Sequence, residues 1–344
     1  MTKRVSIIIP CRNEERFIGE CLDSVLAQDY PQDQIEIFIA DGMSTDRTRE
    51  ILDDYAKRYS FIRWLDNPRK IVSTGLNILI GRAEGDFIIR LDVHADYPQN
   101  YISQCVKYII EYQVDNVGGF LNIKPGNSTL TARAIALAIS RGFGAGNASF
   151  KTGAIAPKFV DTVPFGCFQR DVFKKVGLFD EDLIRNQDDE FNSRIIKNGG
   201  KVLLVPEIII NYYARQFFTQ LWRMNYQYGY FKPLTAIKLG KVMTWRQLAP
   251  ALFIISLAMC GIGFFFYPVF HEILAIESVL YLLVNFTVSA FLASQKGILL
   301  FPFLVASFCV IHFGYGMGYL RGIFDFIILK KNTKKKIQDM KLSR

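Results

Sequence analysis

The chain has 344 residues, 50 % of them hydrophobic, and it carries a formal net charge of +9. This length allows one or two domains. The six cysteines are scattered and none forms a C-x-x-C pair, which argues against a disulfide framework or a zinc cluster and favours reduced thiols. The opening residues MTKRVSIIIP contain neither the apolar region nor the cleavage site of a secretory signal. We therefore expect the N-terminal portion to stay in the cytosol.

Much of the positive charge lies in the tail KKNTKKKIQDMKLSR, and more lies at Lys238, Lys241 and Arg246. These basic groups flank apolar segments, which favours anionic lipid headgroups as the partner and argues against nucleic acid. A solvated, disordered tail explains the charge at the end of the chain equally well.

Up to about residue 245, short apolar strands alternate with segments of helical periodicity. The predicted strands cover residues 5–10, 35–42, 61–67 and 86–92, and the predicted helices cover 14–27, 46–59 and 73–83. This alternation predicts an α/β fold with a mainly parallel sheet covered on both faces. Ligands of such sheets bind at the carboxyl ends of the strands, where this chain places its polar residues.

The region after residue 124 departs from this alternation. Residues 124–160 are rich in Gly, Ser, Thr and Ala and predict a small helix with mobile loops. The stretch DDEFNSRIIK predicts a helix that ends at a Gly-Gly pair, and 201–213 predicts a strand. The aromatic and basic stretch 214–232 predicts a helix, either at the membrane–water interface or packed in the core.

Three apolar segments follow, at roughly 249–270, 273–293 and 298–320. Each is close to the ~20 residues that span a bilayer as a helix. The basic residues before the first segment and in the tail both favour the cytosol, whereas three crossings would place the tail outside. Either the charge rule is broken, or one segment is re-entrant or interfacial. The third segment is the best candidate, because it contains Pro302, His312 and the glycine-rich GYGMGYLRG.

Three possible metal ligands, Asp92, His94 and Asp96, alternate in RLDVHADYP after the fourth predicted strand. Alternate residues of an extended chain point the same way, and carboxylates at a strand end can hold a divalent ion that bridges phosphates. Imidazole is a borderline ligand that suits Mn²⁺ better than Mg²⁺. The alternative is a polar junction, in which an aspartate caps backbone amides and the histidine is solvated.

A phosphate-binding glycine loop is missing, since PCRNEERF matches neither GxGxxG nor GxxxxGK[ST]. This argues against a dinucleotide-dependent enzyme and a P-loop NTPase. The predicted strand ends carry Glu14, Asp41 and Asp92 instead. Such acids accept hydrogen bonds from a base N–H and from ribose hydroxyls, and a metal offsets their repulsion of a diphosphate.

Four segments, in this order and spacing, resemble the family 2 inverting glycosyltransferases of the GT-A fold over roughly residues 3–232. They are VSIIIPCRNEERFIGECLDSVLAQ, IEIFIADGMSTDRT, GDFIIRLDVHADYP and GLFDEDLIRNQDDEFNSRIIKNGG. The chain is similar more specifically to membrane-bound exopolysaccharide glycosyltransferases of the succinoglycan glucosyltransferase type. That likeness is carried by VDTVPFGCFQRDVF, NQDDE, YQYGYFK and the apolar C-terminal third.

The resemblance implies a nucleotide site in which Asp41 hydrogen-bonds the uracil and Asp92 is the first acid of an Asp-x-Asp metal motif. The implied nucleotide-binding residues are Pro10, Arg12, Glu14, Asp41, Ser44 and Asp92. His94 stands at the second aspartate of the motif, which makes Asp92 and His94 the expected metal ligands and Mn²⁺ more expected than Mg²⁺. Asp96 aligns with an acid that is less often a direct ligand.

The resemblance also implies a catalytic base in a Glu-Asp pair before a helix, which here reads Gln187-Asp188. Asp188 takes the position of the base and Asp189 remains its rival. A carboxylate can accept the proton of the acceptor hydroxyl, and clustered acids raise one another's pKa. Without the family context, these acids are better explained as favourable charges at a helix N-terminus.

Arg223, in LWRMNYQYG, matches a family region near the diphosphate, and its alternative role is interfacial snorkelling. Arg90 and Lys70 are weaker candidates for the diphosphate. The chain is thus expected to contain four regions. They are a GT-A catalytic domain (1–213), amphipathic interface helices and a linker (214–248), a membrane region with about three apolar helices (249–329) and a basic tail (330–344).

We therefore expect a metal-dependent, membrane-bound hexosyltransferase that moves a sugar from a nucleotide-sugar, with UDP as the expected nucleotide. Its expected acceptor is a lipid-linked (polyprenyl) saccharide in exopolysaccharide or cell-surface glycan synthesis. The expected location is the inner or plasma membrane, with several crossings and a cytoplasmic catalytic domain. Two alternatives are direct transfer to polyprenyl phosphate and a non-catalytic membrane protein that binds nucleotide-sugar. The acids at positions 92, 188 and 189 argue against the second.

Overall fold

The computed structural model describes residues 3–146, 148–241 and 245–331 and divides into two units. The first unit comprises Met1–Asn122 and Ser149–Tyr212, and the second comprises Ile123–Ala148 and Tyr213–Arg344. The first unit ends one residue before the expected boundary at residue 213. The segment 123–148, which we expected in the catalytic domain, belongs instead to the second unit.

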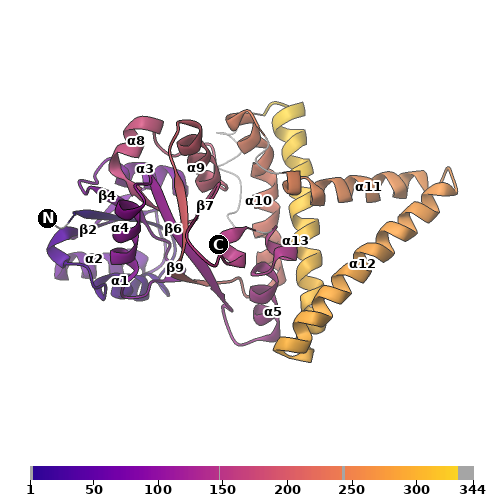
Figure 1. Ribbon diagram of the computed structural model, residues 1–344, viewed down its shortest axis with the longest axis horizontal. Coiled ribbons are helices and arrows are strands. Elements are labelled where there is room, and N and C mark those ends of the chain that lie inside the picture. Colours follow the sequence, from indigo (N-terminus) through magenta and orange to yellow (C-terminus); the bar gives the residue numbers. More distant parts are fainter. Residues whose placement is uncertain (1–2, 147, 242–244, 332–344) are drawn as a thin grey trace. The chain divides into compact units, whose positions relative to one another are not determined.

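A single mixed sheet forms the centre of the first unit (Figure 1). Its strands are β1 (Val5–Cys11), β2 (Ile35–Asp41), β3 (Ile62–Asp66), β4 (Phe87–Arg90), β5 (Ala95–Asp96), β6 (Asn116–Lys124), β7 (Lys158–Phe159), β8 (Cys167–Gln169) and β9 (Val202–Tyr213). The strand order is β3-β2-β1-β4-β8-β6-β9-β5, and β7 pairs with β9. The strands β3, β2, β1 and β4 are parallel, whereas β8 runs antiparallel to both β4 and β6.

The parallel half of the sheet confirms the four strands and the α/β fold predicted from the sequence. Every residue of β1 and β2 is buried, as expected for apolar strands that helices cover on both faces. The helical segments of this unit are α1 (Ile18–Leu26), η1 (Gln32–Gln34), α2 (Thr48–Arg58), α3 (Val72–Ile80), α4 (Tyr101–Glu111), α7 (Ser149–Thr152), α8 (Arg170–Val176) and α9 (Gln187–Lys197).

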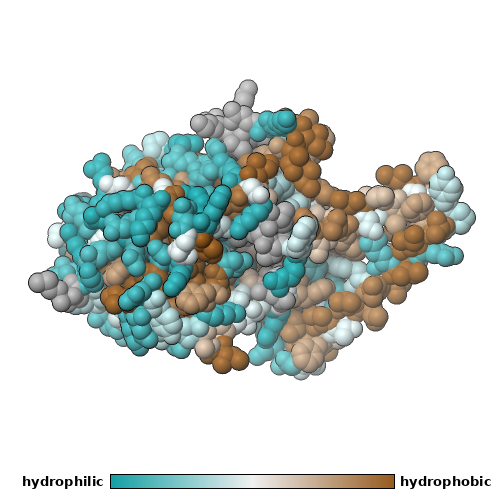
Figure 2. All heavy atoms as spheres, turned by 45° about the horizontal axis from the view of Figure 1, so that its top comes forward, coloured by the Kyte–Doolittle hydropathy of each residue, from teal (hydrophilic) through white to brown (hydrophobic). Residues whose placement is uncertain are grey.

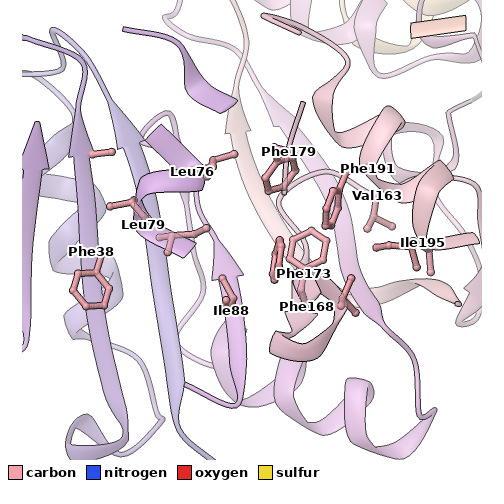
Figure 3. Packing of buried hydrophobic residues seen from close by; sticks show 14 of the residues in the cluster. Phe38, Leu76, Leu79, Ile88, Val163, Phe168, Phe173, Phe179, Phe191 and Ile195 are labelled. Carbon is pink, nitrogen blue, oxygen red and sulfur yellow. The ribbon is translucent and has the colours of Figure 1, made fainter. Parts of the chain in front are cut away.

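A cluster of phenylalanines fixes α9 against the sheet (Figure 3). Phe191 of α9 is fully buried and stacks on Phe173 and Phe179, with ring centroids 5.2 and 4.5 Å apart. Phe168 of β8 meets Phe191 edge to face at 5.5 Å. Because buried aromatic side chains dominate core energetics, this cluster holds the first turn of α9 at a defined position beside β8 and its neighbour β4.

The second unit contains the apolar C-terminal region. Its helical segments are α5 (Leu130–Ile139), α6 (Gly142–Ala145), α10 (Phe218–Leu239), η2 (Trp245–Gln247), α11 (Ala249–Gly263), α12 (Val269–Lys296), η3 (Ile298–Leu300), α13 (Phe301–Gly322) and η4 (Ile323–Ile328). Three stretches, Trp245–Gly263, Val269–Lys296 and Ile298–Ile328, are long and apolar enough to cross a membrane. They coincide with the three predicted apolar segments. Most of the predicted basic tail, 332–344, lies outside the described residues.

Helix α5 explains why the segment 123–148 departs from the expected domain boundary. Its sequence LTARAIALAI buries Ala134, Ile135 and Ala138 in a cluster that includes Leu304 and Phe308 of α13. A helix with such an apolar face needs an apolar partner to cover it. The composition of 124–160 indicated a small helix, but only the tertiary structure shows that α13 supplies this partner.

Candidate active site

The sheet opens at the end of β1. Pairing between β1 and β4 stops at Ile8, whereas pairing between β1 and β2 continues to Cys11. Pro10 is buried in this last part of β1, and a proline has no backbone N–H to donate. It therefore suits the point where neighbouring strands separate, which is where ligands of open α/β sheets bind.

The loops after β1 and β2 interlock at this opening. The backbone N–H of Asn13 donates to Ser44 Oγ over 2.8 Å, and that of Thr45 donates to Asn13 Oδ1 over 2.8 Å. The side chain of Arg12 crosses Gly42, where an added Cβ would lie 3.1 Å from Arg12 Cβ. Two predicted nucleotide-binding residues, Arg12 and Ser44, therefore meet at one place.

Asp41 is fully buried at the end of β2 and accepts hydrogen bonds from the backbone N–H and the hydroxyl of Ser44. Its Oδ2 also accepts a 2.6 Å hydrogen bond from Arg49 Nε, while Arg49 Nη2 pairs with Asp66 at the end of β3. Arg49 thus neutralises two acids at neighbouring strand ends. The sequence analysis did not identify Arg49. Its only signal was its position in the first turn of the helix that follows a strand-end acid.

Glu14 and His94 connect the first strand end with the fourth. Glu14 is 4 % exposed, and its Oε1 lies 3.1 Å from His94 Nε2. The ring of His94 also meets the ring of Phe17 edge to face at 4.9 Å. A buried carboxylate is costly unless it is paired. The imidazole beside Glu14 therefore gives a physical reason for a histidine at this position of the motif.

Asp92 follows β4 and shapes the turn there. Its Oδ1 accepts a 3.0 Å hydrogen bond from the backbone N–H of His94, so it caps a backbone amide as in the polar-junction alternative. Burial raises the pKa of the Cys21 thiol, and the charges of Asp92 and Glu14 raise it further. Asp96 is exposed on β5, where it accepts a hydrogen bond from Asn211 Nδ2 over 3.3 Å.

Asp92 and His94 present a carboxylate and an imidazole, which fit Mn²⁺ better than Mg²⁺. If His94 Nε2 donates to Glu14, Nδ1 keeps the lone pair that a metal needs, and Glu14 fixes the tautomer. Within the described ranges, no group of three His, Cys, Asp or Glu residues is able to hold an ion alone. A metal held by Asp92 and His94 would therefore need further ligands, such as diphosphate oxygens and water.

Asp188, the predicted base, lies in the first turn of α9 and forms an ion pair with Arg90, the last residue of β4. The side chain of Arg90 is 4 % exposed and that of Asp188 is 22 % exposed. The guanidinium of Arg90 also lies over the ring of Phe165, 5.4 Å from its centroid. The proposed base is thus held by a buried cation that stands two residues before Asp92. The sequence analysis considered Arg90 only as a weak candidate for the diphosphate.

Opposing effects set the pKa of Asp188. Burial raises this pKa, the charge and hydrogen bond of Arg90 lower it, and the charges of Asp189 and Asp92 raise it again. The result is a pKa above the ordinary value of an aspartate. A higher pKa makes a carboxylate a stronger general base. Asp188 and Asp92 are linked in the structure by Arg90, which pairs with Asp188 and stands two residues before Asp92.

Arg223, the residue expected near the diphosphate, lies on α10 in the second unit and is exposed. It lines an open groove of about 570 Å³. The residues that line this groove are Phe218, Thr219, Trp222, Arg223, Tyr226 and Val310. An exposed guanidinium bordered by aromatic rings suits a phosphate group attached to an apolar or aromatic moiety.

Comparisons with known proteins bear on the family of this chain. The family model described as "Glycosyl transferase family 2" matches residues 6–177. A Methanococcus voltae protein named dolichyl N-acetyl-alpha-D-glucosaminyl phosphate 3-beta-D-2,3-diacetamido-2,3-dideoxy-beta-D-glucuronosyltransferase is 30 % identical over 94 % of this chain and 99 % of its own length. The succinoglycan biosynthesis protein ExoA of Rhizobium meliloti (strain 1021) is 29 % identical over 71 % of this chain and 73 % of its own length.

A solved structure supports the fold. The mannosyltransferase PcManGT from Pyrobaculum calidifontis, in complex with GDP-Man and Mn²⁺, has a TM-score of 0.61 with 18 % identity, over 94 % of this chain and 88 % of that chain. This likeness concerns the fold alone. Together with the matched residues and the near full-length relative, it confirms the resemblance predicted from the sequence. This chain belongs to glycosyl transferase family 2 and combines a GT-A fold with apolar C-terminal helices.

Proposed function

We propose that the protein is a membrane-bound inverting glycosyltransferase that moves a sugar from a UDP-sugar to a lipid-linked saccharide in exopolysaccharide or cell-surface glycan synthesis. The observation that carries this proposal is the ion pair of Arg90 and Asp188. The charge of Asp92 also raises the pKa of Asp188. The ion pair brings the proposed base to the strand end where we propose that the donor diphosphate binds.

In the proposed reaction, an acceptor hydroxyl gives its proton to the carboxylate of Asp188 while its oxygen bonds to the anomeric carbon. The bond from that carbon to the phosphate oxygen breaks on the opposite face, which inverts the configuration. The nucleoside diphosphate leaves with the electron pair. Asp92 and His94 would hold a divalent cation, which would supply positive charge for this leaving group. Arg90 keeps the carboxylate of Asp188 oriented.

We propose that the nucleoside binds where the loops after β1 and β2 interlock. Asp41 and Ser44 would contact its nucleobase, and Pro10 and Glu14 would lie beside the nucleoside. Arg12 supports this proposal, because its buried Nε has no hydrogen-bond partner among the described residues. A buried N–H without a partner costs free energy. A ribose or phosphate oxygen of the donor would satisfy it.

A donor screen tests the proposed function. Membranes that contain the protein and a lipid-linked saccharide are given UDP-sugars or GDP-sugars, with Mn²⁺, Mg²⁺ or a chelator, and released nucleoside diphosphate is measured. We expect release from a UDP-sugar with Mn²⁺ and loss of release with the chelator. Turnover of GDP-sugars alone would contradict UDP as the nucleotide, and full activity with the chelator would contradict the metal.

The lipid-linked acceptor is proposed from two observations. The Methanococcus voltae relative is named for transfer to a dolichyl phosphate-linked sugar, and three helical stretches of this chain are apolar enough for a bilayer. With radiolabelled donor, we expect label on a polyprenyl-linked saccharide. Label on polyprenyl phosphate alone would identify direct transfer to the lipid. Equal rates on a soluble saccharide without a lipid would contradict the lipid requirement.

His94→Asp is expected to retain activity and to shift the metal preference towards Mg²⁺, because a carboxylate is a harder ligand than imidazole. The ratio of kcat/KM with Mn²⁺ to that with Mg²⁺ should fall by about tenfold. Thermal stability should also fall, since the new carboxylate would stand beside the buried Glu14. Asp96→Asn is the matched control and should keep the parent ratio. An unchanged ratio in His94→Asp would remove His94 from the metal site.

Arg223→Gln is expected to raise the KM for the nucleotide-sugar by about tenfold, because one charge-assisted contact to the diphosphate is lost. Arg223→Lys should recover part of this loss, since the charge remains. The KM for the acceptor should not change. A rise in the acceptor KM alone would assign Arg223 to the lipid phosphate and would contradict its role at the donor.

A further inference from the structure

Within the second unit, α11 and α12 contact α13 only through the base of a hairpin (Figure 1), as far as the described residues show. An added Cβ at Gly316 would lie 2.5 Å from the carbonyl oxygen of Pro250, at the start of α11. Tyr281, in the middle of α12, hydrogen-bonds His312 Nδ1 over 3.1 Å, and Asn285 donates to the carbonyl oxygen of Val305. The segment 255–280 therefore forms the outer part of the hairpin.

The two arms of this outer part, from α11 and α12, contact each other. Ser256 Oγ donates to Glu277 over 2.9 Å, and the rings of Phe264 and His271 lie 3.8 Å apart at the turn. Hydrophobic side chains cover the outside of both arms (Figure 2). Those exposed by more than a third are Ile255, Met259, Ile262, Phe264, Phe265, Phe266, Tyr267, Val269, Ile273, Ile276, Val279 and Leu280.

This exposure is not confined to one stripe. On α12, Ile276, Leu282 and Val284 are exposed at 66, 42 and 39 %. At about 100° per residue they point to three different sides of the helix. A helix that is apolar on several faces is matched by hydrocarbon rather than by water or by a single partner helix. Residues 247–295 contain no lysine or arginine, whereas Arg246 and Lys296 stand at the two ends. The two acids of the outer part are Glu272, in the first turn of α12, and Glu277, which accepts a hydrogen bond from Ser256 of the other arm.

Helix α13 has a different environment. One third of its span is buried within the structure, compared with 11 % for each of the other two spans. Its glycines touch the backbone of α10: an added Cβ would lie 2.1 Å from Tyr226 O at Gly318 and 2.2 Å from Tyr230 O at Gly322. Such contacts require the two helices to move together.

A crossing by α13 would therefore carry α10 into the bilayer. Helix α10 contains Arg223, Lys232 and Lys238, and charged residues are expensive in hydrocarbon. The other half of α13 packs against α5, which contains Arg133. Two helices packed against α13, α10 and α5, thus carry cations that favour an aqueous or headgroup position.

We infer that the α11–α12 hairpin enters the lipid bilayer and returns, and that α13 stays with α10 on the side of entry. The outer part of the hairpin contains residues 255–263 of α11 and 269–280 of α12. These are about 14 and 18 Å of helix at 1.5 Å per residue, shorter than the ~30 Å hydrocarbon core. Arg246, Lys296 and Lys330 then lie on one side, as positive charges on the cytoplasmic side require. The conflict between three crossings and the charge rule disappears, because α13 does not cross.

Cysteine accessibility in sealed vesicles of known orientation tests this inference, which rests on the proposed membrane location. Single cysteines are placed at Lys57 of the first unit, at Gln295, at Leu329 and at the hairpin turn (Phe265→Cys), and a membrane-impermeant maleimide is added to the outside. All four positions are exposed. Five of the six native cysteines are buried and Cys309 is half-buried. Labelling of the parent protein therefore measures the background reaction of the native cysteines. Turnover of each variant checks its folding.

We expect Lys57→Cys, Gln295→Cys and Leu329→Cys to react from the same side, and Phe265→Cys to resist the reagent from that side. Opposite sides for Gln295→Cys and Leu329→Cys would show that α13 crosses and would overturn the inference. Reaction of Phe265→Cys from the side of Gln295→Cys would show that the hairpin is not inserted. Release of the intact protein by alkaline carbonate is a separate measurement, and it would contradict the membrane location itself.

Discussion

Asp188→Asn is expected to lower kcat by about 10²–10⁴-fold, the usual contribution of a general base. The amide has the shape of the carboxylate but cannot accept the proton of the acceptor hydroxyl. Donor binding should remain, because the proposed nucleotide contacts come from residues after β1, β2 and β4 and not from Asp188. Steady-state turnover and the Kd for the nucleotide-sugar measure the two effects separately.

Asp189→Asn is the matched control, since Asp189 follows Asp188 in the same turn of α9. This variant should keep most of the parent kcat. A large loss in Asp189→Asn together with normal turnover in Asp188→Asn would reverse the assignment of the base. Complete loss of both donor binding and turnover in Asp188→Asn would instead indicate a damaged fold, which thermal unfolding would reveal.

Arg90→Gln is expected to move the acid limb of the kcat profile to higher pH. Arg90 lowers the pKa of Asp188, so removal of its charge lets burial and the neighbouring acids raise that pKa further. The base is active only as the carboxylate, and activity is lost as the pH falls through its pKa. The pH at half-maximal kcat should therefore increase. The decrease in kcat relative to the parent protein should be smaller at high pH than at low pH.

Arg90→Gln should also reduce the free energy of unfolding by about 2 kcal/mol. Loss of one partner of a fully buried ion pair costs more than this. The cost is lower here because the Asp188 side chain is 22 % exposed and water can solvate it. The double variant Arg90→Gln with Asp188→Asn should be more stable than Arg90→Gln alone at neutral pH, because no unpaired carboxylate remains. Arg58→Gln removes an exposed ion pair with Asp54 and should change stability much less than Arg90→Gln does.

An unchanged acid limb in Arg90→Gln would show that Arg90 does not act through the base. A double variant no more stable than Arg90→Gln would contradict the energetic coupling of the pair. Either result would leave Asp188→Asn as an independent test of the base itself.

The strand ends were predictable because they depend on local patterns. Continuous apolar runs mark strands buried on both faces, and parallel strands place their carboxyl ends at one edge. Glu14, Asp41 and Asp92 therefore had to approach one another once the runs were recognised as parallel strands. The contact of Glu14, after the first strand, with His94, after the fourth, follows that expectation.

The partners of these acids were not predictable in the same way. Arg90 meets Asp188 because β8 inserts antiparallel beside β4 and the phenylalanine cluster fixes α9 there. Arg49 reaches two strand ends because α2 follows β2 and β3 lies next to it. In both cases the distance between the charges depends on strand order and helix packing, which leave no periodic signal in the sequence.

The sequence by itself determined the family, the parallel strands, the order of the strand-end acids and the three apolar segments, because each depends on residues close together in the chain. Only the tertiary structure decided that His94 pairs with Glu14, that Arg90 holds Asp188 and that α13 packs against α10 and α5. These outcomes depend on contacts between distant residues. Such contacts form only when the sheet and the helices bring the residues together, because burial makes an unpaired charge or an uncovered apolar face costly.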